Sequence, residues 1–253
     1  MCASYVSWYS GTGIRNGKKS GKEDSVKAKS TSLRGSQGGS EQAGSSRKKS
    51  KRLPYAERRA QILEKATELF SEYGLTAQTR ALAAECGISQ RLLYRFFPTK
   101  EDLLKEVYDT RIIGPFQAVW FAELSDRSRS MSDRLNKFYK DYLDTVLGRR
   151  WLRLFLYSSL AEADMAPNYI SSIITKLTET IVHETAYEKG ITLDMEPEAI
   201  HEIGWTIHGS ISHYAIRRHI YQASQVVSQD MVVATHVSVF LNGFDAMVAQ
   251  LDN

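Results

Sequence analysis

Cysteine and proline are scarce in this chain of 253 residues, which contains two cysteines and five prolines. Cys2 and Cys86 lie in very different contexts, so we expect no disulfide between them, as is typical of a reducing compartment. The longest apolar runs are short or interrupted by arginine, and they predict no membrane-spanning helix. The amino terminus also has no charged lead followed by an apolar core and a cleavage site. We therefore expect a cytoplasmic protein.

Enzyme and metal motifs are missing as well. The sequence has no glycine-rich phosphate loop after a strand, no nucleophile elbow and no HExxH pair. Its six histidines are scattered. Two of them, His201 and His208, share a helix face but lie two turns apart, about 10 Å along the axis, too far for one ion. We expect no enzymatic activity, no metal site and no cofactor.

Positive charge is concentrated at the amino-terminal end. Residues 1–52 carry 12 Lys and Arg against three acidic residues, residues 53–105 carry eight against seven, and residues 106–253 carry 13 against 19. A polyanionic partner would therefore meet the first two segments. The acidic third segment would be held away from it.

The amino-terminal residues 1–52 are rich in Ser, Gly and Lys and almost free of aliphatic residues after Ile14. Such a segment cannot bury enough apolar surface to offset chain entropy, so we predict a disordered basic arm. Three interpretations of this arm remain open. It is a solvated linker, a flexible arm that touches phosphates or a minor groove, or a segment upstream of a translation start at Val26 or Leu33.

From Pro54 onward the apolar residues recur with helical spacing, and no segment alternates in the manner of a strand. The sequence therefore predicts an all-α protein. A first helix ends at Gly74, whose lack of a side chain suits a left-handed cap. After residue 115 we expect further helices at about 130–147, 150–163, 167–188, 197–220 and 228–251.

The most informative part of the sequence is residues 79–100, which predict two short helices joined by a turn at residues 86–88. Gly87 supplies the small residue that the tight turn needs, and Ser89 caps the second helix. Thr99 and Asp102 form a capping box at the start of the next helix. Two helices joined in this way place the second in the major groove of DNA. The pattern predicts a helix-turn-helix.

Side chains at the start of the second helix have the chemistry to read bases. Arg91 can form a forked pair with guanine, and Gln90 can do the same with adenine. Thr79, Tyr94 and Lys100 offer contacts to phosphate. The full candidate DNA-binding set is Thr79, Arg80, Ser89, Gln90, Arg91, Tyr94, Arg95 and Lys100.

These helices, caps and glycines resemble the tetracycline-repressor (TetR) family of transcriptional regulators. The matching positions are Ile62, Leu63, Ala66, Leu69, Phe70, Gly74, Thr79, Leu82, Ala83, Cys86, Gly87, Ile88, Ser89, Leu93, Tyr94, Phe97, Lys100, Glu101 and Leu104. The resemblance implies a homodimer that binds a palindromic operator in double-stranded DNA, most often as a repressor. It also implies a divergent carboxyl-terminal helical domain, in which a small-molecule effector changes the separation of the two DNA-reading heads.

Several positions depart from the family pattern. Gln78 stands where Thr or Ser is usual, and Leu92 stands where Thr or a small residue is usual, which weakens the case for a base contact there. Arg91 and Arg95 replace commoner neutral residues, which favours stronger or more guanine-directed recognition. Cys86 replaces a common alanine, and we interpret it as core-filling, with a redox switch at the turn as the alternative.

We divide the chain into the disordered basic arm at 1–52, a helix-turn-helix DNA-binding domain at 53–105, and a ligand-binding and dimerisation domain at 106–253. Most aromatic residues of the third segment are expected to be ordinary core, but the family design predicts a pocket for an apolar or aromatic ligand. His208, Tyr142 or Ser212 would orient it. The candidate ligand-binding residues are Phe138, Tyr142, Trp151, Phe155, Tyr169, Trp205 and His208.

The last two predicted helices carry apolar residues on more than one face, which suits a four-helix bundle formed between two copies. A monomer that buries both faces internally is the alternative. For the function as a whole, the alternative class is an all-α ligand-binding or enzymatic protein whose helix-turn-helix has another role.

Overall fold

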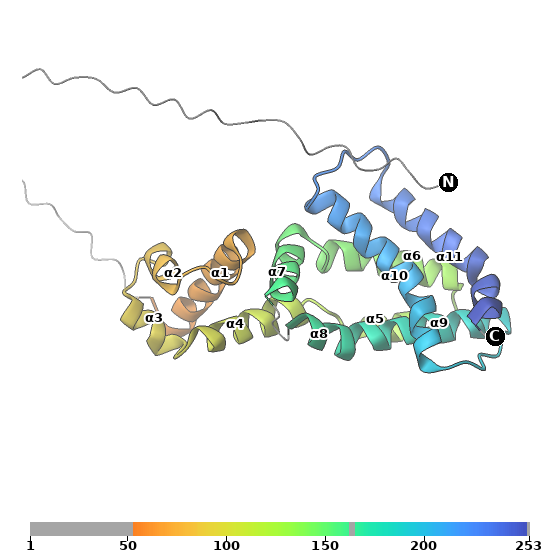
Figure 1. The fold of residues 1–253 in the computed structure, drawn as a ribbon, viewed down its shortest axis with the longest axis horizontal. Coiled ribbons are helices and arrows are strands. Elements are labelled where there is room, and N and C mark those ends of the chain that lie inside the picture. The colour runs from red at the N-terminus through yellow and green to blue at the C-terminus, as the bar shows by residue number, and fades with distance from the viewer. Residues whose placement is uncertain (1–52, 162–164, 252–253) are drawn as a thin grey trace, which may run out of the picture. The chain divides into compact units, whose positions relative to one another are not determined.

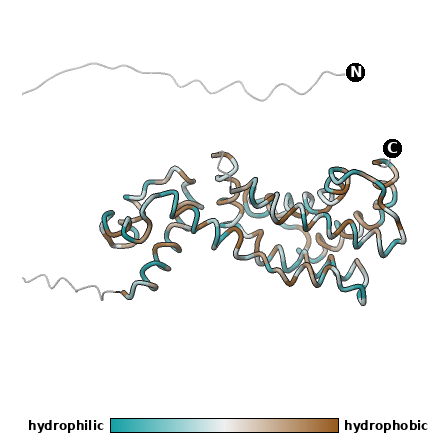
Figure 2. Tube along the Cα trace, turned by 90° about the horizontal axis from the view of Figure 1, so that it is seen from below, coloured by the Kyte–Doolittle hydropathy of each residue, from teal (hydrophilic) through white to brown (hydrophobic). Residues whose placement is uncertain are grey.

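The computed structural model describes residues 53–161 and 165–251, and the predicted arm at 1–52 lies outside them. Regular structure in the described residues is helical throughout, without a strand, which confirms the all-α prediction (Figure 1). Apolar and polar residues follow one another at short intervals along the helices (Figure 2), as is typical of helices that bury one side. The helices are α1 (Tyr55–Tyr73), α2 (Thr79–Glu85), α3 (Gln90–Phe96), α4 (Lys100–Tyr108), α5 (Val119–Leu124), α6 (Met131–Thr145), α7 (Arg149–Leu160), α8 (Met165–Tyr169), α9 (Thr175–Lys189), α10 (Pro197–His219) and α11 (Gln229–Leu251), with π-helical turns η1 (Asp109–Ile113) and η2 (Ile170–Ile174).

The first four helices follow their sequence signals closely. Gly74 and Gly87 adopt positive φ angles of 80° and 63° at the ends of α1 and α2, a conformation that favours glycine. The ψ angle of Gly74 is 174°, so this residue is not the left-handed cap that the sequence predicted. The Ser89 side chain accepts a hydrogen bond from the Leu92 N–H, and Thr99 with Asp102 forms the expected capping box. These caps fix where α3 and α4 begin.

The later helices match the predicted ranges with two differences. The six-residue helix α5 was not predicted, because it is too short to show a helical period. The single helix expected at 167–188 is instead α8, the π-turn η2 and α9 in succession. A π-turn inserts one extra residue into the helical repeat, which sequence periodicity does not reveal.

Helix α11 is an exception to the prediction that no helix of this protein could span a membrane. Among the described helices it is long and apolar enough to do so by length and composition, although only 28% of its most apolar stretch is buried. Its inner residues Val233, Val237 and Phe244 are fully buried, and α11 packs against α6 and α10. It is therefore a core helix of this bundle that leaves one apolar side uncovered.

Helices α9 and α10 cross at Gly204, where only a glycine fits. A Cβ on Gly204 would lie 3.0 Å from the Thr178 carbonyl oxygen and still closer to the Thr178 Cβ. We expect Gly204→Ala to lower the free energy of unfolding by about 1 to 3 kcal/mol, because the extra methyl group overpacks the crossing. Chemical denaturation measures this change.

Gly209 on the same helix is the matched control. A Cβ there would meet its nearest neighbour, Trp205 Cε3, at 3.8 Å, which is ordinary contact. Gly209→Ala should therefore leave stability unchanged or raise it by up to about 1 kcal/mol, since alanine favours helix. Equal stability of the two variants would contradict the close α9–α10 crossing.

Candidate functional site

Helix α3 is anchored by one face and exposed on the other. Leu93 and the following Phe97 are almost completely buried in the core formed with α1 and α2. The opposite face carries Gln90, Arg91, Tyr94 and Arg95, all of them exposed. The helix can therefore present these four side chains outward while its inner face holds it in place.

A small hydrogen-bond network joins α2 to this exposed face. The Thr79 hydroxyl lies 3.0 Å from the Tyr94 hydroxyl and accepts a hydrogen bond of 3.1 Å from Gln90 Nε2. Thr79 itself is only 7% exposed. The sequence placed Thr79 among the phosphate contacts, whereas the structure places it behind Gln90 and Tyr94, where it orients both.

The arginines of this surface differ from the others of the same domain. Arg80, Arg91 and Arg95 are exposed, and no ion pair or hydrogen bond joins their guanidinium groups to any described residue. Arg59, by contrast, is paired with Glu106. The exposed side of α2 and α3 therefore offers three uncommitted guanidinium groups, which suit phosphate or guanine.

The two remaining candidates, Ser89 and Lys100, have structural roles in addition. The Ser89 hydroxyl oxygen accepts the capping hydrogen bond of α3 at 3.2 Å. The Lys100 ammonium group lies 5.8 Å from the centre of the Phe70 ring and is partly buried. At the first residue of α4 it adds positive charge to a helix amino terminus that already favours anions.

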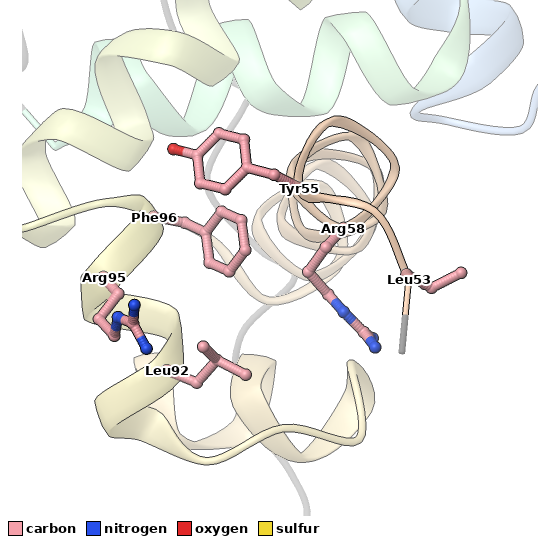
Figure 3. A pocket seen from close by; sticks show the side chains of 6 residues that line it. All are labelled: Leu53, Tyr55, Arg58, Leu92, Arg95 and Phe96. Atoms are coloured by element: carbon pink, nitrogen blue, oxygen red, sulfur yellow. The ribbon is translucent and has the colours of Figure 1, made fainter. Parts of the chain in front are cut away.

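A hollow of about 260 Å³ lies beside α3, between it and the start of α1 (Figure 3). Leu92 lies against this hollow with Arg58 and Arg95, and the stacked rings of Tyr55 and Phe96, whose centres are 4.7 Å apart, form another wall. The Leu92 side chain is half-buried. Its place in this wall accounts for an apolar residue where the family pattern has Thr.

Cys86, at the turn between α2 and α3, is only 4% exposed. Burial raises the pKa of its thiol above the ordinary value. A thiol that is both buried and protonated is a poor nucleophile and reacts slowly with oxidants. These properties favour the core-filling interpretation of Cys86.

In the body, all seven candidate ligand-binding residues belong to one continuous series of rings from α6, α7, α8 and α10. Ring centres are 4.9 to 5.8 Å apart within two groups, Phe155–Trp151–Tyr169 and Phe138–Tyr142–His208–Trp205. A hydrogen bond of 2.9 Å between the Tyr142 and Tyr169 hydroxyls joins the two groups. In order along the series the rings are Phe155, Trp151, Tyr169, Tyr142 with Phe138, His208 and Trp205. The sequence did not predict their contact with one another.

Two buried polar atoms in this ring series have no hydrogen-bond partner among the described residues: the Tyr139 hydroxyl and His208 Nδ1. Burial, with a smaller contribution from His201, lowers the pKa of His208 to about 4, so its imidazole is neutral near pH 7. Tyr139 was missed by the sequence reasoning. Its spacing from Leu135, Tyr142 and Val146 is helical, and that signal would have placed it on the buried face.

The described residues contain no group of three His, Cys, Asp or Glu side chains placed to hold a metal ion. His201 has other contacts. Its Nε2 accepts a hydrogen bond from the Trp205 indole N–H, and its Nδ1 lies 3.1 Å from the Thr178 hydroxyl. This histidine therefore links α9 to α10.

Helix α7 connects the ring series to the amino-terminal helices. One side of α7 carries Trp151 and Phe155, and its arginines contact α1: Arg150 pairs with Glu64 at 2.6 Å, and Arg153 donates to the Glu72 carbonyl oxygen at 2.7 Å. The Trp151 indole N–H also donates to the Ile112 carbonyl oxygen at 3.2 Å, at the end of η1. A displacement of Trp151 would therefore reach both α1 and the turn that follows α4.

Comparison with known proteins agrees with this arrangement. Residues 62–107 match the family model described as bacterial regulatory proteins, tetR family. The fold is similar to that of a TetR-like regulator from Rhodococcus sp. RHA1, with a TM-score of 0.56 and 20% identity over 77% of this chain and 99% of that one.

Two further structures are similar to a comparable degree. The ketosteroid transcriptional regulator KstR2 of Mycobacterium tuberculosis has a TM-score of 0.54 and 18% identity over 74% of this chain and 94% of that one. The fatty acid degradation regulator FadR of Bacillus halodurans has a TM-score of 0.53 and 16% identity over 76% and 97%. At these identities the likeness concerns the fold.

Proposed function

Because this chain belongs to the tetR family of bacterial regulatory proteins, we propose that it is a repressor that binds a palindromic operator as a homodimer and leaves it when a small molecule binds the body. The observation that carries the proposal is the exposed face of α3. There Gln90 and Arg91 stand in the first turn of a firmly anchored helix, where side chains meet base edges in the major groove.

Other residues of the same surface fit contacts with the DNA backbone. Arg80 on α2, Arg95 in the last turn of α3 and Lys100 at the start of α4 add positive charge, and Tyr94 adds an exposed hydroxyl. Phosphate contacts of this kind fix the register of the protein on the duplex, whereas base contacts select the sequence. We assign specificity to Gln90 and Arg91 and affinity to the others.

An electrophoretic mobility shift tests the proposal, with the promoter fragment beside the protein's own gene and a shuffled duplex of equal composition. We expect the promoter to bind at least about 1000-fold more tightly, and both affinities to fall steeply as salt is raised. Equal binding of the two duplexes, or binding insensitive to salt, would contradict a sequence-reading regulator.

The uncovered side of α11 supports the homodimer. Met231 and Val239 are more than half exposed, although both lie on a helix whose inner side is core. Apolar residues in such an arrangement suit a second copy of α10 and α11, which would complete a four-helix bundle. Two copies also supply the two reading helices that a palindrome requires.

Val239→Glu is expected to weaken dimerisation by at least about 100-fold, because it buries an unpaired carboxylate in the interface. Sedimentation velocity at micromolar concentration should show a dimer for the wild type and a monomer for the variant. Val226→Glu, at a 90% exposed position between α10 and α11, is the matched control and should remain dimeric. A dimeric Val239→Glu protein would place the interface elsewhere.

We assign transmission of the effector signal to α7. A ligand among the rings would displace Trp151 or Phe155, and the same helix holds α1 through Arg150 and Arg153. Each exposed ion pair contributes little alone, but together they set the angle at which α1 meets α7. To release the operator, the ligand must bind the conformation whose α1–α7 angle no longer fits DNA more tightly than the conformation that fits it, by a few kcal/mol.

A further inference from the structure

We propose that the effector is an uncharged, largely apolar molecule with a hydroxyl or carbonyl group, and that this group binds between Tyr139 and His208. The inference rests on the proposed function, since it names the class of ligand that the body would sense. It adds Tyr139 as a specificity-determining residue, and it excludes organic anions and cations as effectors.

Two buried polar atoms between α6 and α10 lack hydrogen-bond partners. The Tyr139 side chain is fully buried and His208 is 3% exposed, yet neither the Tyr139 hydroxyl nor His208 Nδ1 has a hydrogen bond within the described residues. Folded proteins leave few such atoms, because each one gives up its hydrogen bonds to water without replacement. The pair is therefore set up to receive a partner from outside the chain.

Arg111 Nε and Arg134 Nε also lack partners, but each of these guanidinium groups is paired through another of its nitrogens. Polar side chains near Tyr139 and His208 are bonded too. The Tyr142 hydroxyl, on the next turn of α6, pairs with Tyr169, and His201, two turns before His208 on α10, is bonded through both ring nitrogens. The Tyr139 and His208 rings are only 6.2 Å apart. We place one ligand hydroxyl or carbonyl group between these two side chains.

Buried charges in the body are already neutralised by one another. Among the fully described side chains, the buried charged residues are Arg134 and Glu184, and they pair with each other at 3.1 Å. Arg134 is further held by Glu188 and by the Leu124 carbonyl oxygen. The interior has no spare charge to neutralise a ligand ion, and an unpaired ion buried among apolar side chains is strongly disfavoured.

The chemistry of Tyr139 and His208 suits an uncharged ligand group. A tyrosine hydroxyl donates or accepts, and a neutral imidazole nitrogen does one or the other according to its tautomer. Burial keeps His208 in its neutral form at physiological pH. Both groups therefore complement a neutral hydroxyl or carbonyl, while Phe138, Tyr142 and Trp205 offer ring surface to an apolar or aromatic frame.

We expect the ligand to reach His208 and Tyr139 from the side of Trp205. Its indole meets the His208 ring edge-on at 5.4 Å and is only partly buried, whereas Tyr139 and Tyr142 are completely enclosed. A Cβ at the neighbouring Gly209 would lie 3.8 Å from this indole, so the glycine places no side chain against it. Outward rotation of Trp205 would expose His208 first and Tyr139 behind it.

The unpartnered hydroxyl can be tested without a ligand. Tyr139→Phe should raise the melting temperature by about 2 to 6 °C, because it removes a buried polar group that has no hydrogen bond. Tyr142→Phe is the matched control one turn away, and it should lower the melting temperature because Tyr169 loses its partner. A fall in both variants would show that the Tyr139 hydroxyl is satisfied and would overturn the proposal.

The class of ligand is tested by thermal shift with paired probes on the full chain. 2-Naphthol and 4-phenylphenol are expected to raise the wild-type melting temperature in a saturable way, and their carboxylate counterparts 2-naphthoate and 4-phenylbenzoate are not. Tyr139→Phe and His208→Phe should each bind the phenols at least about five-fold more weakly. Equal shifts from phenols and carboxylates, or no shift from either phenol, would overturn the inference.

The two proposals fail in different ways. If the wild-type protein selects its promoter in the mobility shift but shows no preference for the neutral probes, the inference about the effector is wrong and the regulator proposal stands. If the phenols bind through Tyr139 and His208 but no DNA sequence is selected, the proposed function fails and the neutral binding site remains.

Discussion

Arg91→Ala is expected to lower affinity for the operator by about 10- to 100-fold while changing the affinity for shuffled DNA by only a few-fold. A forked arginine–guanine contact provides discrimination of this size. Arg91 has no ion pair among the described residues, so the substitution removes no internal bond and should leave the fold intact. Fluorescence anisotropy with labelled operator and shuffled duplexes, at one fixed salt concentration, measures both affinities.

Lys100→Ala is the comparison for Arg91→Ala. Lys100 stands at the amino terminus of α4 and is assigned to phosphate, so its loss should weaken operator and shuffled DNA alike and make the salt dependence shallower. If Arg91→Ala also weakened both duplexes uniformly, Arg91 would contact phosphate instead of a base. The specificity assigned to the first turn of α3 would then be wrong at that position.

Arg134→Met is expected to lower the free energy of unfolding by about 3 kcal/mol and the melting temperature by about 6 to 12 °C. The Arg134 side chain is 1% exposed and bonds Glu184, Glu188 and the Leu124 carbonyl oxygen. The methionine fills similar space but leaves the carbonyl oxygen and Glu188 without their partner. Differential scanning calorimetry of the two proteins measures the change.

Arg127→Met provides the control because it removes a second guanidinium from the same carboxylate. Arg127 forms two hydrogen bonds to Glu184, but its side chain is 50% exposed. Water can replace it, so we expect little change in stability. A loss as large as that of Arg134→Met would mean that solvent does not reach this end of the ion pair.

The local features of the amino-terminal helices were predictable because they depend on residues close in sequence. Gly87 at the turn, the Ser89 cap and the Thr99–Asp102 capping box each act within four residues, and all are present in the structure. The unpredicted helix α5 and π-turn η2 lie where this reasoning fails. One is too short for a period, and the other changes the period.

The candidate sites were predictable as sets of residue types but not as contacts. Sequence spacing placed Gln90 and Tyr94 on the exposed face of α3. Their hydrogen bonds to Thr79 join residues 11 and 15 positions apart, respectively, and depend on how α2 meets α3. In the body, Tyr142 was chosen for its bulk, and its pairing with Tyr169 depends on packing between distant helices. Such pairings are set by tertiary structure, which residue periodicity does not encode.

The central claim is that the exposed face of α3 reads a DNA sequence, and selection of bound duplexes from a random library tests it most directly. The account predicts enrichment of an inverted repeat, with half-sites in successive major grooves about 10 base pairs apart. In a parallel selection with Arg91→Ala, preference should be lost at one symmetric base-pair position and kept elsewhere. Enrichment of no sequence, or an identical motif from both proteins, would contradict it.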